Sequence, residues 1–163
     1  MDLPNDVSIQ LDPTFIENDL LRDVWNYWNL KRGSRLMPSR RDINPAEFKS
    51  QVAHVLLVDV LSNAQDFRYR LIGSKLARHF PTDVTGMTFR AALASYGDAS
   101  IAATVQVYRT VALGRAAAHI KGPGGWFGQE SKVFEAILLP LSDDGKHANM
   151  IFGAFYFDWS PLV

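Results

Sequence analysis

Apolar positions change their spacing along the chain. Between residues 12 and 30 they recur every three or four positions, as in a helix with one buried face. Asp12-Pro13 is typical of a helix start, and Gly33 of a helix end. The sequence therefore predicts an amphipathic N-terminal helix. Its apolar stripe is formed by Ile16, Leu20, Leu21, Val24, Trp25, Tyr27 and Trp28.

After residue 53 the spacing becomes that of β-strands. Residues 54–61 are apolar on both faces, as expected of a buried central strand. Residues 67–72 alternate, and a polar turn at 62–65 joins the two segments into a hairpin. The alternation places Phe67, Tyr69 and Leu71 inward and Arg68 and Arg70 outward.

Short irregular helices are predicted over 74–80 and 85–94, and a longer one from Asp98, ended by Gly114. Three further strands follow, and residues 149–158 are apolar on both faces, which predicts a central strand beside 54–61. The expected fold class is α+β, a five-stranded antiparallel sheet with helices on one face and the amphipathic helix added. The predicted strands are 54–61, 66–73, 115–121, 130–141 and 149–158.

The chain is long enough for one domain with a substantial core. We divide it into a loose N-terminal arm (1–11), the N-terminal helix with a basic connector (12–53), the sheet domain (54–158) and a short tail (159–163).

Charge and composition exclude several classes of function. The 17 basic and 17 acidic residues cancel, which gives no general attraction to nucleic acid or anionic membranes, and Arg35, Arg40 and Arg41 alone support nucleic-acid binding poorly. Without cysteine there is no disulfide, thiolate metal site or cysteine nucleophile. No apolar run is long enough for a membrane span, and the acidic N-terminus is unlike a signal peptide, so we expect a cytoplasmic protein.

Four stretches carry a resemblance to a known family: Leu21 to Trp28, Arg35 to Pro45, Phe67 to Ser74 and Thr82 to Gly86. Together with the last strand they resemble the PAS domain superfamily, in particular a bacterial PAS family long catalogued as of unknown function. Pro81 departs from this pattern, since glycine is expected before the polar turn. The resemblance implies a cupped sheet, an interior able to hold a small molecule, and signalling through helices packed on the sheet. It carries over no catalytic or ligand residue.

No pattern of catalytic or metal-binding residues is evident. The four histidines lack metal-ligand spacing, and His79 is better explained as a surface or capping residue than as a haem ligand. Glu135 is expected to be an outward strand charge, with the alternative of orienting a buried ligand. No second carboxylate is placed to form an acid/base pair with it. We expect no metal, haem, flavin or other cofactor.

Aromatic residues are the candidates for a ligand pocket between the sheet and the Asp98–Leu113 helix. The alternative is that they fill an ordinary core. The candidates are Tyr69, Tyr108, Trp126, Phe134 and Phe155.

Two functional hypotheses follow. The first is a non-enzymatic sensory or protein-interaction module, which would act through another chain because no output domain follows Asp158. The second is a small-molecule-handling enzyme with an α+β pocket. The broad stripe of the N-terminal helix favours a homodimer or partner contact, and packing on its own domain is the alternative. The residues of this interface would be Ile16, Leu20, Leu21, Val24, Trp25 and Trp28.

Overall fold

The computed structural model describes residues 6–124 and 133–158. It contains one antiparallel sheet of six strands in the order β1-β4-β5-β6-β2-β3. The α+β class is confirmed, and so is the central position of β6 (Met150–Phe157) between β5 (Val133–Leu141) and β2 (Val55–Leu61). The remaining strands are β1 (Ser8–Leu11), β3 (Asp66–Ile72) and β4 (Ala118–Pro123).

The sheet has one strand more than predicted, because residues 8–11 are not a loose arm. They form β1, which pairs antiparallel with β4 from Ser8 opposite Lys121 to Leu11 opposite Ala118. Most of its side chains are exposed. Since main-chain hydrogen bonds hold β1 in the sheet, the pattern of apolar side chains does not reveal it.

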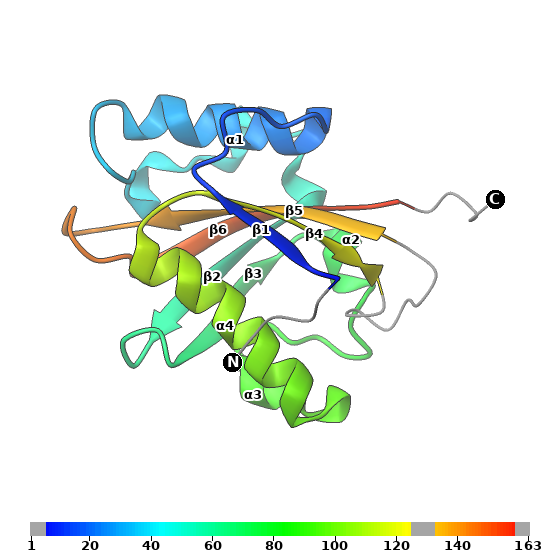
Figure 1. Cartoon of the computed structure of the whole chain (residues 1–163). Helices are drawn as coiled ribbons and strands as arrows, with labels where there is room; N and C mark the ends of the chain where they lie inside the picture. The colour runs from blue at the N-terminus through cyan, green and yellow to red at the C-terminus, as the bar shows by residue number, and fades with distance from the viewer. Residues whose placement is uncertain (1–5, 125–132, 159–163) are drawn as a thin grey trace.

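Helices cover both faces of the sheet (Figure 1). The sequence predicts helices on one face and an added N-terminal helix, and it is this N-terminal helix that covers the second face. On one face lie α2 (Ser74–Ala77), α3 (Phe89–Ala92) and α4 (Asp98–Gly114), with the short 3-10 helix η4 (Ala94–Tyr96) between α3 and α4. On the other lies α1 (Asp19–Arg32). Two separate apolar clusters result, one on each face.

The helix α1 begins later than the sequence predicts. The Asn18 side chain caps it by accepting a hydrogen bond from the Leu21 backbone N–H at 3.1 Å. Asp12, the predicted cap, instead has a positive φ of 46° at a bend. Asparagine and aspartate are both favoured caps, so composition alone does not choose between them.

The stripe of α1 packs on its own domain. Ile16, Leu21, Val24 and Trp28 are buried, while Leu20 and Trp25 are half-buried. The Trp28 indole N–H donates to the carbonyl oxygen of Pro140 in β5 at 3.0 Å. The four buried side chains are therefore not available to a partner while the chain is folded.

The connector after α1 is fixed to the same face. It contains three 3-10 helices, η1 (Arg40–Asp42), η2 (Pro45–Glu47) and η3 (Val52–His54). Phe48 lies between α1 and the sheet, with ring centroids 5.0 Å from Tyr27 and 5.4 Å from Phe152. The Tyr27 hydroxyl lies 2.7 Å from Glu47, and burial followed by this hydrogen bond raises the pKa of Tyr27 to about 12. Residues 12–53 therefore pack as part of the sheet domain.

A β-bulge changes the outward face of β3. Leu57 pairs with Leu71 and Val58 with Tyr69, which leaves Arg70 as the extra residue. Tyr69 points into the core as predicted, but Leu71 is 38% exposed instead of inward. Arg68 and Arg70 both pair with Asp59, each at 3.1 Å. Since Asp59 is buried, these arginines neutralise an interior charge rather than simply facing solvent.

This triad gives a testable prediction. Arg68→Ala leaves Arg70 to pair with Asp59, and Arg68 is 43% exposed, so we expect a loss of only about 0.5–1 kcal/mol in the free energy of unfolding. The double variant Arg68→Ala/Arg70→Ala leaves a buried carboxylate unpaired and should lose about 3 kcal/mol or more. Urea unfolding measures both. Adding Asp59→Asn to the double variant should restore part of the lost free energy of unfolding. The triad would be contradicted if the double variant lost no more than the sum of the losses in Arg68→Ala and Arg70→Ala.

Candidate functional site

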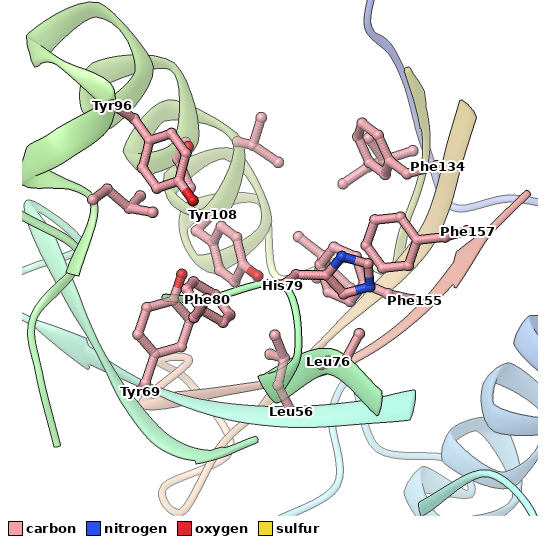
Figure 2. A pocket seen from close by; sticks show the side chains of 15 residues that line it. Leu56, Tyr69, Leu76, His79, Phe80, Tyr96, Tyr108, Phe134, Phe155 and Phe157 are labelled. Carbon is pink, nitrogen blue, oxygen red and sulfur yellow. The ribbon is translucent and has the colours of Figure 1, made fainter. Parts of the chain in front are cut away.

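The candidate site is a cavity between the sheet and α4 (Figure 2). Four of the five predicted ligand residues line it: Tyr69 from β3, Tyr108 from α4, Phe134 from β5 and Phe155 from β6. The fifth, Trp126, lies outside the described residues. The structure thus places the cavity where the sequence predicts a pocket, between the sheet and the helix that begins at Asp98.

The strands place their aromatic residues by simple alternation. Phe155 and Phe157 are two residues apart in β6 and therefore share a face, and Phe134 lies opposite Phe157 in the register with β5. Small residues make room beside them. A Cβ at Gly153 would lie 2.9 Å from Leu138 Cδ2 and 3.1 Å from Leu56 Cδ1, so glycine lets these two leucines reach the cavity wall.

Several lining residues were not predicted. The segment after α2 contributes His79 and Phe80, and η4 contributes Tyr96. The His79 ring stacks on Phe157 with centroids 4.0 Å apart, so this histidine is part of the cavity wall rather than a simple surface or capping residue. The signal available in the sequence is only the local cluster His79-Phe80, because the segment has no helical or strand period.

The aromatic rings are packed against one another. The Phe80 ring lies edge-on to Tyr69, with ring centroids 5.4 Å apart. The Phe89 ring contacts both tyrosines, with centroids 4.6 Å from Tyr69 and 4.8 Å from Tyr108. Such edge-on and tilted arrangements are favourable for aromatic pairs. The tyrosines are therefore held in place by their neighbours, and their hydroxyls have fixed positions.

The described lining contains no Asp, Glu, Lys or Arg. Its polar groups are the hydroxyls of Tyr69, Tyr96, Tyr108 and Thr104 and the His79 ring. Thr104 Oγ donates to the carbonyl of Ser100 at 2.8 Å, within α4. Burial raises the pKa of Tyr69 and of Tyr108 above the ordinary value, so both phenols stay protonated at neutral pH. The site can donate hydrogen bonds to a neutral molecule.

Glu135 lies on the opposite face of the sheet from the cavity. Its carboxylate is 2.6 Å from His119 Nε2, and Lys121 lies 3.7 Å away. It contacts His119 and Lys121 of the neighbouring strand and does not reach the cavity.

Within residues 6–124 and 133–158, no group of three or more His, Cys, Asp or Glu residues could hold a metal ion. Over the same ranges, no helix is of a length and hydropathy that would span a membrane.

No curated protein matches the sequence. Among solved structures, the chain is similar to an RNA-binding light-oxygen-voltage receptor, at 13% sequence identity and a TM-score of 0.46. That match covers 94% of this chain but 39% of the receptor chain, so this chain spans well under half of the receptor's length. A family model described as PAS domain matches residues 16–156.

That match includes α1 and nearly the whole sheet. Membership in the PAS domain family indicates a sensory or signalling module, which agrees with a cavity between the sheet and α4. The chain belongs to the PAS domain family.

Proposed function

We propose that the chain is a non-enzymatic sensory or protein-interaction module of bacterial signal transduction, whose signal is a small, largely apolar molecule held between the sheet and α4. The observation that carries this proposal is the aromatic cavity, to which β2 to β6, α2 and α4 all contribute. Apolar enclosure with a few convergent polar groups is the usual form of a small-molecule site.

The enzyme alternative has less support. Acid/base chemistry commonly needs a positioned pair of titratable groups. The described lining contains no Asp, Glu, Lys or Arg, so it offers no carboxylate for such a pair. The binding module therefore remains our proposal.

The output is a contact with a partner protein or a second copy of the chain. Since Ile16 before α1 and three stripe residues of α1 are buried, the contact would use the side chains that α1 leaves accessible, among them half-buried Trp25 and Leu30, which is 78% exposed. The helix packs directly on β5 and β6, and both strands also line the cavity. A change in the cavity could thus reach α1 through two strands.

Native mass spectrometry of the purified chain tests both parts of the proposal. We expect a bound small molecule or, if none is retained, uptake of one from a cell extract. Gly153→Ala should reduce this occupancy, because the added Cβ pushes Leu56 and Leu138 toward the cavity.

The same spectra report the oligomeric state. A dimer through α1 should dissociate in Leu30→Lys and persist in Asn26→Lys, a change to an exposed polar position on the same helix. A chain that binds nothing from the extract and remains monomeric without a partner would contradict the proposal.

A further inference from the structure

Two tyrosines that are buried as residues have hydroxyls that open onto the cavity and have no hydrogen-bond partner among the described residues. Tyr69 and Tyr108 are only 4% and 5% exposed. Among the described residues, neither hydroxyl has a hydrogen-bond partner, whereas the hydroxyl of Tyr27, on the other face, lies 2.7 Å from Glu47. No fully enclosed side-chain N or O atom of the described residues lacks a partner, so these two hydroxyls open onto the cavity itself.

An acceptor inside the cavity would satisfy both groups. Buried polar groups are nearly always hydrogen-bonded, and an exception usually marks a bound water or ligand. Figure 2 shows the Tyr69, Tyr96 and Tyr108 side chains around one space. Tyr96 lies near enough to Tyr69 to raise the pKa of Tyr69, after the larger effect of burial, and Tyr69 lies near enough to Tyr108 to raise the pKa of Tyr108 in the same way. The donors therefore converge on one region.

The described lining also restricts the charge of the occupant. It offers no Arg or Lys to pair with an anion and no Asp or Glu to pair with a cation. Moving an unpaired ion into such a site is strongly unfavourable. The remaining wall is apolar, with six aliphatic side chains and four phenylalanines, and the rings of Phe80, Phe134, Phe155 and Phe157 offer edge-on or offset contacts to a flat ring.

Size limits the occupant to a small molecule. The cavity volume is about 50 Å³, enough for a few water molecules but less than the roughly 150 Å³ of an engineered cavity that binds benzene. A ring must therefore displace part of the wall. The segment carrying His79 and Phe80 is suited to this, because the backbone N–H groups of Ala77, His79 and Phe80 donate locally, to the carbonyls of Gly73, Leu76 and Ala77, and not to a strand of the sheet.

We propose that the cavity binds a neutral, single-ring aromatic molecule with a carbonyl oxygen, to which Tyr69 and Tyr108 donate hydrogen bonds. The ring lies among the phenylalanines, and it enters as the His79–Phe80 segment moves outward. This inference rests on the proposed sensory function and specifies the chemistry of the signal.

Three probes of similar shape test the chemistry by isothermal titration calorimetry: acetophenone, ethylbenzene, which lacks the oxygen, and benzoate, which is charged. We expect the intact chain to bind acetophenone about three- to tenfold more tightly than ethylbenzene, the value of one or two net hydrogen bonds. Benzoate should bind more weakly than either.

Tyrosine-to-phenylalanine variants keep the packing and remove only the donors. In Tyr69→Phe/Tyr108→Phe the ratio of the acetophenone affinity to the ethylbenzene affinity should fall to about one, because the hydroxyls that donate to the carbonyl oxygen are gone. Tyr156→Phe is the matched control, since Tyr156 lies in β6 on the opposite face and is 39% exposed.

Equal binding of acetophenone and ethylbenzene by the intact chain would overturn the inference and leave the sensory function standing. The same holds if the preference survives in the double variant or if benzoate binds best. If none of the three probes binds, the inference fails, and the small-molecule part of the proposed function is still decided by native mass spectrometry with a cell extract.

Discussion

Trp28→Ala should lower the free energy of unfolding by about 3–5 kcal/mol, the range of large-to-small changes at buried aromatic positions. Trp28 is 4% exposed and packs in the apolar cluster beneath α1. Its removal also leaves the Pro140 carbonyl without the indole donor and the Arg32 guanidinium without the ring that it covers at 5.3 Å. Urea unfolding followed by far-UV circular dichroism measures the loss.

Two controls separate the causes. Trp28→Phe keeps an aromatic ring but loses the hydrogen bond, so we expect about 1–2 kcal/mol. Trp25→Ala removes a half-buried ring from the same helix and should cost less than Trp28→Ala. If Trp28→Ala lost less free energy of unfolding than Trp25→Ala, α1 would not pack on the sheet as a cooperative part of the domain.

This packing also decides how an α1-mediated contact can be studied. A chain shortened to start at Asp42 would expose the cluster that includes Leu57, Ile137, Leu139 and Phe152. Large exposed apolar surfaces promote association, so such a chain would aggregate for reasons unrelated to a native dimer. Point changes at exposed α1 positions are the sounder experiment.

Most elements can be predicted where side-chain periodicity is strong. The segments of β6 and β2 are both apolar on both faces, and this predicts both strands and their contact. The features that sequence reasoning missed depend on the main chain instead. β1 is held by backbone pairing to β4, and the bulge at Arg70 is a register shift that no residue type demands.

The same distinction explains the site. Tyr69, Phe134 and Phe155 were predicted because strand alternation fixes their face, and Tyr108 because helical spacing does. His79 and Tyr96 come from irregular segments, where direction depends on tertiary packing alone. The unpartnered hydroxyls of Tyr69 and Tyr108 emerge only when the neighbours of each are known.

Phe155→Ala tests the stability of the cavity wall and its capacity together. Phe155 is 5% exposed, and its ring lies 6.5 Å from Phe134 and 6.4 Å from Phe157. We expect a loss of about 3 kcal/mol in the free energy of unfolding, near the lower end for a buried phenylalanine, because one side of the ring lines the cavity and has fewer protein neighbours to lose. Urea unfolding gives the value.

The control is Tyr156→Ala, one position along β6 on the more open face, which should cost less than about 1.5 kcal/mol. Comparable losses of stability in Phe155→Ala and Tyr156→Ala would show that the assignment of faces is wrong.

Phe155→Ala should also change ligand binding. Removing the ring enlarges a cavity of about 50 Å³ toward the size that accepts benzene, so ethylbenzene should bind Phe155→Ala more tightly than the intact chain. Because Tyr69 and Tyr108 are untouched, acetophenone should keep its preference over ethylbenzene in that variant, and loss of the preference would show that the hydroxyls do not direct binding.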